Sequence, residues 1–273
     1  MSDAVTLTLR APLAEPIEAE CVRADRFAAL DEREIAALPV WLGRRQARLG
    51  DFFEVRGART ARVRIAGDVR RVDGLGAGMT GGELVIDGDA GSRVAAGLTG
   101  GHVEVVGSAG DDAGMGMTGG TLYVRGRAGD RVGAAAPGAS KGMTGGEIVV
   151  RGSAGRDAGA RMRRGLLFVG GDAGDSVARA TIAGTVIVLG RTGRNPAFAS
   201  KRGTLVAVGG VDIPVTYRFA CTYEPPHVRL ALTYLRGRYD VGIDRTFITG
   251  RYRRFCGDAG EPGTGEILEW LTE

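Results

Sequence analysis

The sequence predicts an all-β protein, a right-handed parallel β-helix of about seven coils with non-repeat α/β caps at both ends. Three observations lead to this prediction: a glycine that recurs at a fixed step, an alternation of apolar residues after it, and a further glycine after the alternation. Units of this size are too small to bury a core alone. A period kept over seven of them therefore indicates stacked coils that share one interior.

The recurring glycine sets the period of the repeat. Consecutive copies are 19 residues apart, except at one step of 26 residues. The seven copies are Gly82, Gly101, Gly120, Gly146, Gly165, Gly184 and Gly203. We expect right-handed winding, because the left-handed form has a six-residue period and 19 is not a multiple of six.

Each repeat is expected to contain one short strand, because apolar residues stand two and four places after the recurring glycine. These residues are, in pairs, Leu84 and Ile86, Val103 and Val105, Leu122 and Val124, Ile148 and Val150, Leu167 and Val169, Val186 and Val188, and Leu205 and Ala207. Six places after the recurring glycine, every repeat has another glycine, from Gly88 to Gly209, which we interpret as a corner of the coil.

The chain is expected to have three parts. Residues 1–60 form an N-terminal cap, with a short helix over 31–38 and a strand over 49–55. Residues 61–210 hold the parallel β-helix repeats. Residues 211–273 form a C-terminal extension that packs on the helix or on a partner, since the ends of a repeat stack need covers.

Two segments admit two interpretations each. The apolar stretch 228–235 in the C-terminal extension is predicted as a strand or a short helix. The seven extra residues of the long step fall within 134–141 and form a loop at one corner of the stack. That loop is either a tolerated bulge or a contact loop for a partner.

The later repeats carry an apolar outer face. Strand residues one, three and five places after the recurring glycine point away from the interior, and they change from polar in the early repeats to apolar in the later ones. We predict a partner interface at Leu166, Phe168, Ile187, Leu189, Val206 and Val208. Six exposed side chains of this size exceed what a monomer normally leaves open to water. We therefore expect the C-terminal segment, another subunit or both to cover them.

Basic residues are expected to gather on another side of the later repeats. This basic ridge consists of Arg161, Arg163, Arg164, Lys201 and Arg202. It is either a solvated face or the rim of a contact between subunits, or a dock for a polyanion or an acidic partner. Nucleic acid is not expected to bind, because no aromatic residues stand between the basic ones.

Composition and cysteine usage point to a cytoplasmic protein without membrane contact. The formal net charge of +4 is modest for 273 residues. The three cysteines are far apart and lack a paired spacing, as expected of free thiols in a reducing compartment. No apolar N-terminal run resembles a signal peptide, and no segment approaches the ~20 apolar residues of a membrane span.

No residue is predicted to be catalytic or to bind a metal. Residues 114–119 match the GxGxxG pattern, but they lead into a predicted strand, whereas a dinucleotide-binding fingerprint must open a helix. The only histidines are His102 and His227, and their spacing suits no metal.

Acidic residues also stack at one corner of the repeats. Asp111, Asp112 and Asp130 could bind a cation or act as acid and base. However, Arg156 takes the place of the acid in the next repeat, so salt-bridged surface columns are the favoured interpretation.

Two units of the repeat resemble the GXGXG-type β-helix. They are GMTGGELVIDGDAG at residues 78–91 and GMTGGTLYVRGRAG at residues 116–129. That module is shared by the C subunit of formylmethanofuran dehydrogenase and the C-terminal domain of the glutamate synthase large subunit. The chain has non-repeat segments on both sides of its repeats, and its tail over 252–267 also resembles the end of the C subunit. It therefore resembles the family of these C subunits, and most of all the C subunit of the bacterial formyltransferase/hydrolase complex.

The resemblance implies a non-catalytic structural subunit of a hetero-oligomeric complex in the one-carbon metabolism of methylotrophs. That complex moves a formyl group from formyl-tetrahydromethanopterin to a methanofuran-type carrier and hydrolyses it to formate. It implies that this chain binds no cofactor directly, that zinc lies in another subunit, and that the partners are the other subunits of the complex. The carrier bears a polyglutamyl tail, so the resemblance makes the basic ridge a candidate site for that tail.

Three alternatives remain open at this point. The chain could be a subunit of a true formylmethanofuran dehydrogenase, or a structural domain like that of glutamate synthase, with a flavin- and glutamine-using partner. An independent polysaccharide-acting β-helix enzyme would be expected to show a secretion signal and a groove of acidic or basic catalysts, and the sequence shows neither.

Overall fold

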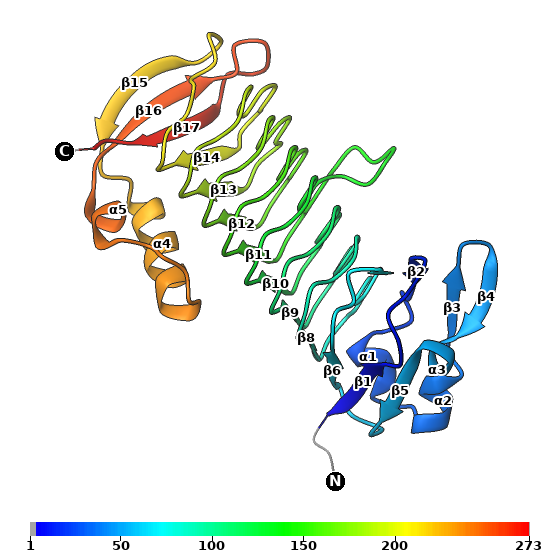
Figure 1. The fold of residues 1–273 in the computed structure, drawn as a ribbon. Helices are drawn as coiled ribbons and strands as arrows, with labels where there is room; N and C mark the ends of the chain where they lie inside the picture. The colour runs from blue at the N-terminus through cyan, green and yellow to red at the C-terminus, as the bar shows by residue number, and fades with distance from the viewer. Residues whose placement is uncertain (1–3, 273) are drawn as a thin grey trace.

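Strands dominate the structure, a computed structural model that describes residues 4–272 (Figure 1). One mixed sheet of 13 strands runs the length of the chain in the order β15-β16-β17-β14-β13-β12-β11-β10-β9-β8-β6-β1-β5. A smaller sheet, β4-β3-β2-β7, lies at the N-terminal end. The predicted all-β character is confirmed at this level: the protein is mostly β, with short helices near both ends.

The repeats supply the central strands of the large sheet. These strands are β6 (Arg62–Ala66), β8 (Glu83–Ile86), β9 (His102–Val105), β10 (Thr121–Val124), β11 (Glu147–Val150), β12 (Leu166–Val169), β13 (Thr185–Val188) and β14 (Thr204–Ala207). Neighbouring strands in this series are parallel, and equivalent repeat positions face each other, as Leu84 faces Val103. The 19-residue period therefore sets the register of the sheet.

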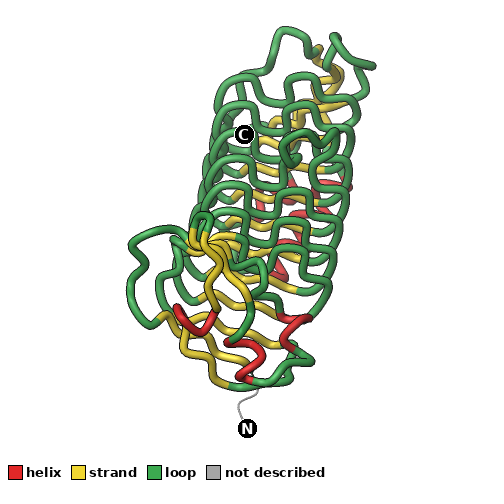
Figure 2. The backbone as a smooth tube through the Cα atoms, turned by 90° about the vertical axis from the view of Figure 1, so that its right-hand side faces the viewer, coloured by secondary structure: helices red, strands yellow, loops and turns green. Residues whose placement is uncertain are grey.

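A second row of equivalent residues is joined by single parallel bridges. The bridged residues are Val69, Ala90, Ala109, Ala128, Ala154, Ala173 and Thr192. Between these two rows the chain turns through loops that lie one above another along the molecule (Figure 2). Within this series, each repeat thus pairs with the repeat before it and the repeat after it, as in other stacked-repeat architectures.

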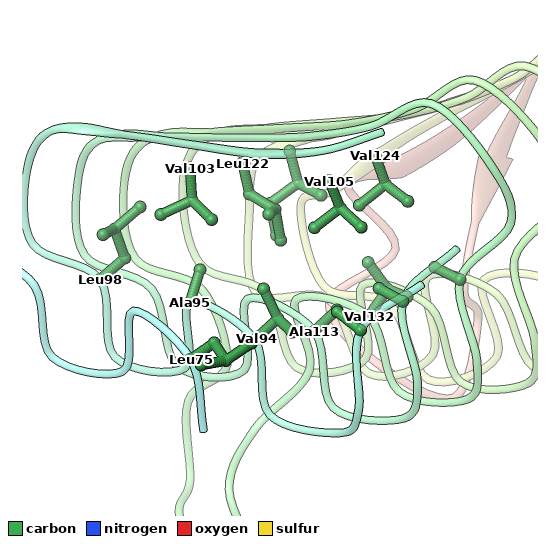
Figure 3. Packing of buried hydrophobic residues seen from close by; sticks show 14 of the residues in the cluster. Leu75, Val94, Ala95, Leu98, Val103, Val105, Ala113, Leu122, Val124 and Val132 are labelled. Carbon is green, nitrogen blue, oxygen red and sulfur yellow. The ribbon is translucent and has the colours of Figure 1, made fainter. Parts of the chain in front are cut away.

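The interior of the stack is filled by the apolar residues of the strands and corners (Figure 3). The residues two and four places after the recurring glycine are buried, with Leu122 and Val124 fully so. The methionines three places before it, such as Met117 and Met143, are also fully buried. Close stacking explains the glycines: a Cβ added to Gly101 would lie 2.6 Å from the carbonyl oxygen of Gly82.

The N-terminal part folds into short elements beside the first repeat. They are β1 (Val5–Leu9), β2 (Ile17–Glu18), α1 (Ala24–Phe27), α2 (Glu32–Ala36), β3 (Pro39–Leu42), β4 (Arg45–Arg48), α3 (Leu49–Phe52), β5 (Phe53–Arg56) and β7 (Val72–Asp73). The predicted helix over 31–38 is confirmed as α2, which begins with a capping box between Asp31 and Glu34.

The predicted strand over 49–55 is only half correct. The chain forms the helical turn α3 first, and β5 begins at Phe53. The Asp51 carboxylate accepts the backbone N–H of Arg48 at 2.9 Å, which caps that turn. Leu49 and Phe53 are both fully buried, four residues apart, so the apolar pattern fits a helical turn as well as a strand.

The C-terminal part adds β15 (Arg218–Tyr223), α4 (Pro226–Arg238), α5 (Arg245–Thr249), β16 (Tyr252–Gly257) and β17 (Gly265–Trp270). The last strand, β17, pairs in parallel with β14 and extends the large sheet past the last repeat. β16 and β15 then follow as antiparallel strands. The ambiguous stretch 228–235 is helical and lies within α4, beside the outer face of the later repeats (Figure 1).

Candidate functional site

The predicted apolar patch lies on the outer face of β12, β13 and β14 and on the residues just after them. Phe168, Ile187 and Val206 form the centre of this patch and are fully buried. They face one another across neighbouring strands in register. At the margin, Leu166 and Leu189 are half-buried. Val208, the sixth predicted residue, is also buried.

The C-terminal segment of the same chain covers this patch. The apolar side of α4, formed by Val228, Leu232 and Leu235, joins the strand residues in a second hydrophobic cluster. Leu268 of β17 and Tyr252 of β16 belong to the same cluster. The predicted partner interface at Leu166, Phe168, Ile187, Leu189, Val206 and Val208 is therefore corrected: its centre is an internal packing surface and is closed to another subunit.

Polar and aromatic contacts hold α4 on the sheet at its C-terminal end. The Tyr234 hydroxyl donates a hydrogen bond of 2.9 Å to the carboxylate of Glu147 on β11. The rings of Tyr123 on β10 and Tyr239, just after α4, lie 5.0 Å apart between centroids. These contacts reach two strands beyond the predicted patch.

Sequence reasoning left the identity of this cover open, although the signal for a helix was present. The buried residues of α4 are spaced by four and three residues, which is the period of a helical face. Pro225 and Pro226 stand at its start, where proline is favoured.

The structure places the predicted basic ridge on exposed corners of the later repeats. Arg163 and Arg164 are exposed, and among residues 4–272 no carboxylate forms an ion pair with either. Lys201 and Arg202 are exposed two repeats further on, about 10 Å away at ~4.8 Å per repeat. The repeat between these two pairs has no basic residue at the equivalent two positions, so the ridge is interrupted there.

Two members of the ridge have partners. The guanidinium of Arg161 donates to the carbonyl oxygen of Ala139 in the corner loop, at 3.0 Å. The ammonium group of Lys201 lies 3.7 Å from the carboxylate of Glu261. The structure thus leaves Arg163, Arg164 and Arg202 as the ridge residues whose side chains have neither an ion pair nor a hydrogen bond in the described part of the chain.

The acidic residues at the other corner form salt-bridged columns, as the sequence favoured. Arg131 contacts Asp112 at 2.7 Å and Asp111 at 3.6 Å, and Arg156 contacts Asp130 at 3.0 Å. The Asp130 carboxylate also accepts the backbone N–H of Arg156, which lowers the pKa of Asp130. These ion pairs tie each repeat to the next.

The GxGxxG match at residues 114–119 leads into strand β10, so the sequence interpretation of a chance match is confirmed. Among residues 4–272, no group of three or more His, Cys, Asp or Glu side chains is placed to hold a metal ion. None of the described helices has the length and apolar character needed to cross a lipid bilayer.

Two open hollows lie beside the segment 10–15 at the N-terminal end. One has a volume of about 530 Å³ and the other about 630 Å³. They share the lining residues Arg10, Ala11, Pro12 and Leu13. No periodicity marks this segment, so sequence reasoning had no signal for it.

Together these features define a class of protein: a stack of short β repeats whose outer flank is packed by its own C-terminal segment. Curated relatives and a solved structure agree with that class. No protein-family model matches the chain.

Curated relatives match part of the chain. An 80-residue stretch is 44% identical to the C subunit of molybdenum-containing formylmethanofuran dehydrogenase 1 from Methanothermobacter marburgensis, covering 28% of this chain and 20% of the relative. An 89-residue stretch is 35% identical to the C subunit of the formyltransferase/hydrolase complex from Methylorubrum extorquens, covering 33% of this chain and 34% of that one. The chain thus spans between a fifth and about a third of the length of these relatives.

A solved structure matches the whole chain. A chain of the crystal structure of the formyltransferase/hydrolase complex (FhcABCD) from Methylorubrum extorquens, in complex with methylofuran, aligns with a TM-score of 0.90 and 36% identity. The alignment covers 98% of this chain and 100% of that chain. The protein therefore belongs to the family of C subunits of formylmethanofuran dehydrogenases and formyltransferase/hydrolase complexes.

Proposed function

We propose that this chain is a non-catalytic structural subunit of a formyltransferase/hydrolase complex. The observation that carries the proposal is the end-to-end match, at 36% identity and a TM-score of 0.90, to a chain of such a complex. The acidic corner supports this role, because the carboxylates considered there as acid and base are held in ion pairs between repeats. The complex would transfer a formyl group from formyl-tetrahydromethanopterin to a methanofuran-type carrier and hydrolyse it to formate.

The proposed fold is a right-handed parallel β-helix of about seven coils. Its support is the in-register parallel pairing from β6 to β14, together with the second row of parallel bridges. The chain would divide into an N-terminal cap (1–60), a β-helix (61–210) and a C-terminal extension (211–273). The extension would act mainly as an internal cover, since α4 occupies the outer face of the later repeats.

The proposed partners are the other subunits of the complex, in the cytoplasm. This chain would bind no cofactor directly, and the carrier, tetrahydromethanopterin and zinc would be held by other subunits. The test is affinity purification of the tagged chain from its native host. Recovery of the other formyltransferase/hydrolase subunits, with formate-releasing activity in the purified material, is the expected result. A formate-releasing monomer would refute the structural role.

A subunit of a true formylmethanofuran dehydrogenase is the second candidate. The observation in its favour is the 44% identity over 80 residues to the molybdenum enzyme's C subunit, which exceeds the 35% identity over 89 residues to the curated bacterial subunit. The same purification separates the two, because the dehydrogenase would co-purify molybdenum or tungsten. A glutamate synthase-like role would instead bring a flavin protein.

We also propose that the unpaired part of the basic ridge holds the acidic tail of the carrier or an acidic partner. Arg163 and Arg164 supply two adjacent, exposed positive charges without an ion pair among residues 4–272. Replacing both by Glu should weaken binding of a polyglutamate peptide to the assembled complex at least about tenfold at low salt, and should flatten the salt dependence.

A matched control is available on α4. Arg229 and Arg236 are also exposed, and the Arg229→Glu/Arg236→Glu variant makes the same change in net charge. Equal weakening in both double variants would mean that only the net charge matters. Unchanged affinity in the Arg163→Glu/Arg164→Glu variant would rule out the ridge as the site.

A further inference from the structure

The two outer edges of the 13-stranded sheet differ in chemistry. The edge strand β5 carries an ion pair of 2.9 Å between Glu54 and Arg56, and charged side chains protect an edge from unwanted pairing. The opposite edge strand, β15, has the sequence RFACTY and pairs only with β16 among the residues described. Its outer backbone groups therefore face away from the sheet without a strand beside them (Figure 1).

Apolar side chains are exposed on and beside β15. Phe219 is 59% exposed and contacts Phe255 in an edge-to-face arrangement, with ring centroids 5.8 Å apart. Val215, three residues before the strand, is 87% exposed. An edge strand that lacks internal charges and carries an exposed aromatic ring has the features of a strand-addition site.

A bulge in β15 argues against pairing with a second copy of this chain. Phe219 faces Phe255 and Cys221 faces Arg254, so one extra residue on β15 lies between these pairs. Phe219 and Cys221 therefore point to opposite faces of the sheet. If two copies paired as antiparallel strands about Cys221, Phe219 of one copy would stand opposite Tyr223 of the other. Tyr223 shares the face of Cys221, so the two rings would lie on opposite faces of the sheet.

The charges at the ends of β15 indicate the chemistry of the missing strand. Arg218 begins the strand and Glu224 follows it directly, and both are exposed. No ion pair within residues 4–272 involves either side chain. Two copies paired about Cys221 would also set Arg218 of one opposite Glu224 of the other, but Phe219 would then have no ring on its own face. A different chain can satisfy both ends and also contact Phe219 with an apolar residue between them.

From this geometry we propose that β15 is a docking site for an extended segment of another subunit of the complex. The segment adds a strand to the sheet, places an acidic residue beside Arg218 and a basic residue beside Glu224, and covers Phe219 with an apolar side chain. This inference rests on the proposed function, because it requires a hetero-oligomeric complex.

The first test compares backbone hydrogen exchange in the free chain and in the complex purified with its subunits. Amides of β15 that exchange in the free chain should exchange at least about tenfold more slowly in the complex, because they gain hydrogen-bond partners. Unchanged exchange in β15 within an intact complex overturns this inference and leaves the proposed function standing. If no complex is recovered with the wild-type chain, the proposed function fails, and this inference fails with it.

The second test uses a matched pair of exposed residues. Phe219→Lys should lower the affinity for the other subunits at least about tenfold, as expected for an aromatic anchor. Leu230→Lys, at a residue of α4 that is 70% exposed, introduces the same charge elsewhere and should change affinity less than about twofold. Equal effects of the two variants overturn the inference. So does a homodimer of the free chain, seen by light scattering, that Phe219→Lys dissociates.

Discussion

Phe168→Ala tests whether the C-terminal segment truly closes the outer face of the later repeats. Phe168 is fully buried and lies in register between Val149 and Ile187 on the neighbouring strands. Full burial of such a side chain contributes about 1.5–3 kcal/mol, and the cavity left by its removal raises the total to about 3–5 kcal/mol. Both neighbours are β-branched and fixed in the sheet, so the cavity cannot collapse easily and we expect the upper half of that range.

The assay is urea denaturation of the isolated chain, followed by fluorescence and circular dichroism. The variant should lose about 4 kcal/mol of unfolding free energy, and amides of α4 should exchange faster because the helix loses part of the hydrophobic cluster on which it packs. Leu230→Ala, on the exposed side of α4, is the control and should stay within about 0.5 kcal/mol of the wild type. A loss below about 1 kcal/mol for Phe168→Ala in the isolated chain would refute the reasoning, since it would mean that α4 does not pack there.

Three further predictions concern the stacking of the repeats and one thiol. Gly100→Ala should unfold at lower urea than Gly81→Ala, because a Cβ at Gly100 would lie 2.4 Å from a backbone oxygen whereas Gly81 has nothing within 4 Å. The backbone N–H of Arg156 lowers the pKa of Asp130, so its stabilisation is present above the unfolded pKa of about 3.9 and is lost as pH falls through the folded pKa. The advantage of wild type over Asp130→Asn should therefore be seen at pH 6 and disappear in acid; a difference that persists at pH 2 would contradict this. Burial raises the pKa of Cys21 to about 11, so iodoacetamide at pH 8 should modify it only after denaturation, as mass spectrometry can check.

The repeat strands could be predicted from the sequence because their register is a local property. The same offset from the recurring glycine gives Leu84, Leu122 and Leu205 the same place in the sheet, and all three are buried. No long-range contact has to be known to place them.

The cover of the outer face could not be predicted in the same way. The apolar row of Phe168, Ile187 and Val206 predicts that another segment must bury it. The row does not say whether that segment is a helix of this chain or a helix of a partner. Which helix covers the outer face depends on the path of the chain after β14, and the sequence there has no repeat from which to predict that path. The membership of the basic ridge could not be fully predicted either, because Arg161 turns toward the corner loop and donates a hydrogen bond to Ala139.

The corner loop has a practical consequence. Thr121 of β10 pairs directly with Glu147 of β11, although this step is 26 residues long instead of 19. The surplus residues leave the stack at the corner and return to it without shifting the pairing, so the architecture accepts added length there. Near Gly138, which is exposed and has φ +80°, a short epitope or fluorophore-binding tag could be grafted to follow assembly of the complex in living cells.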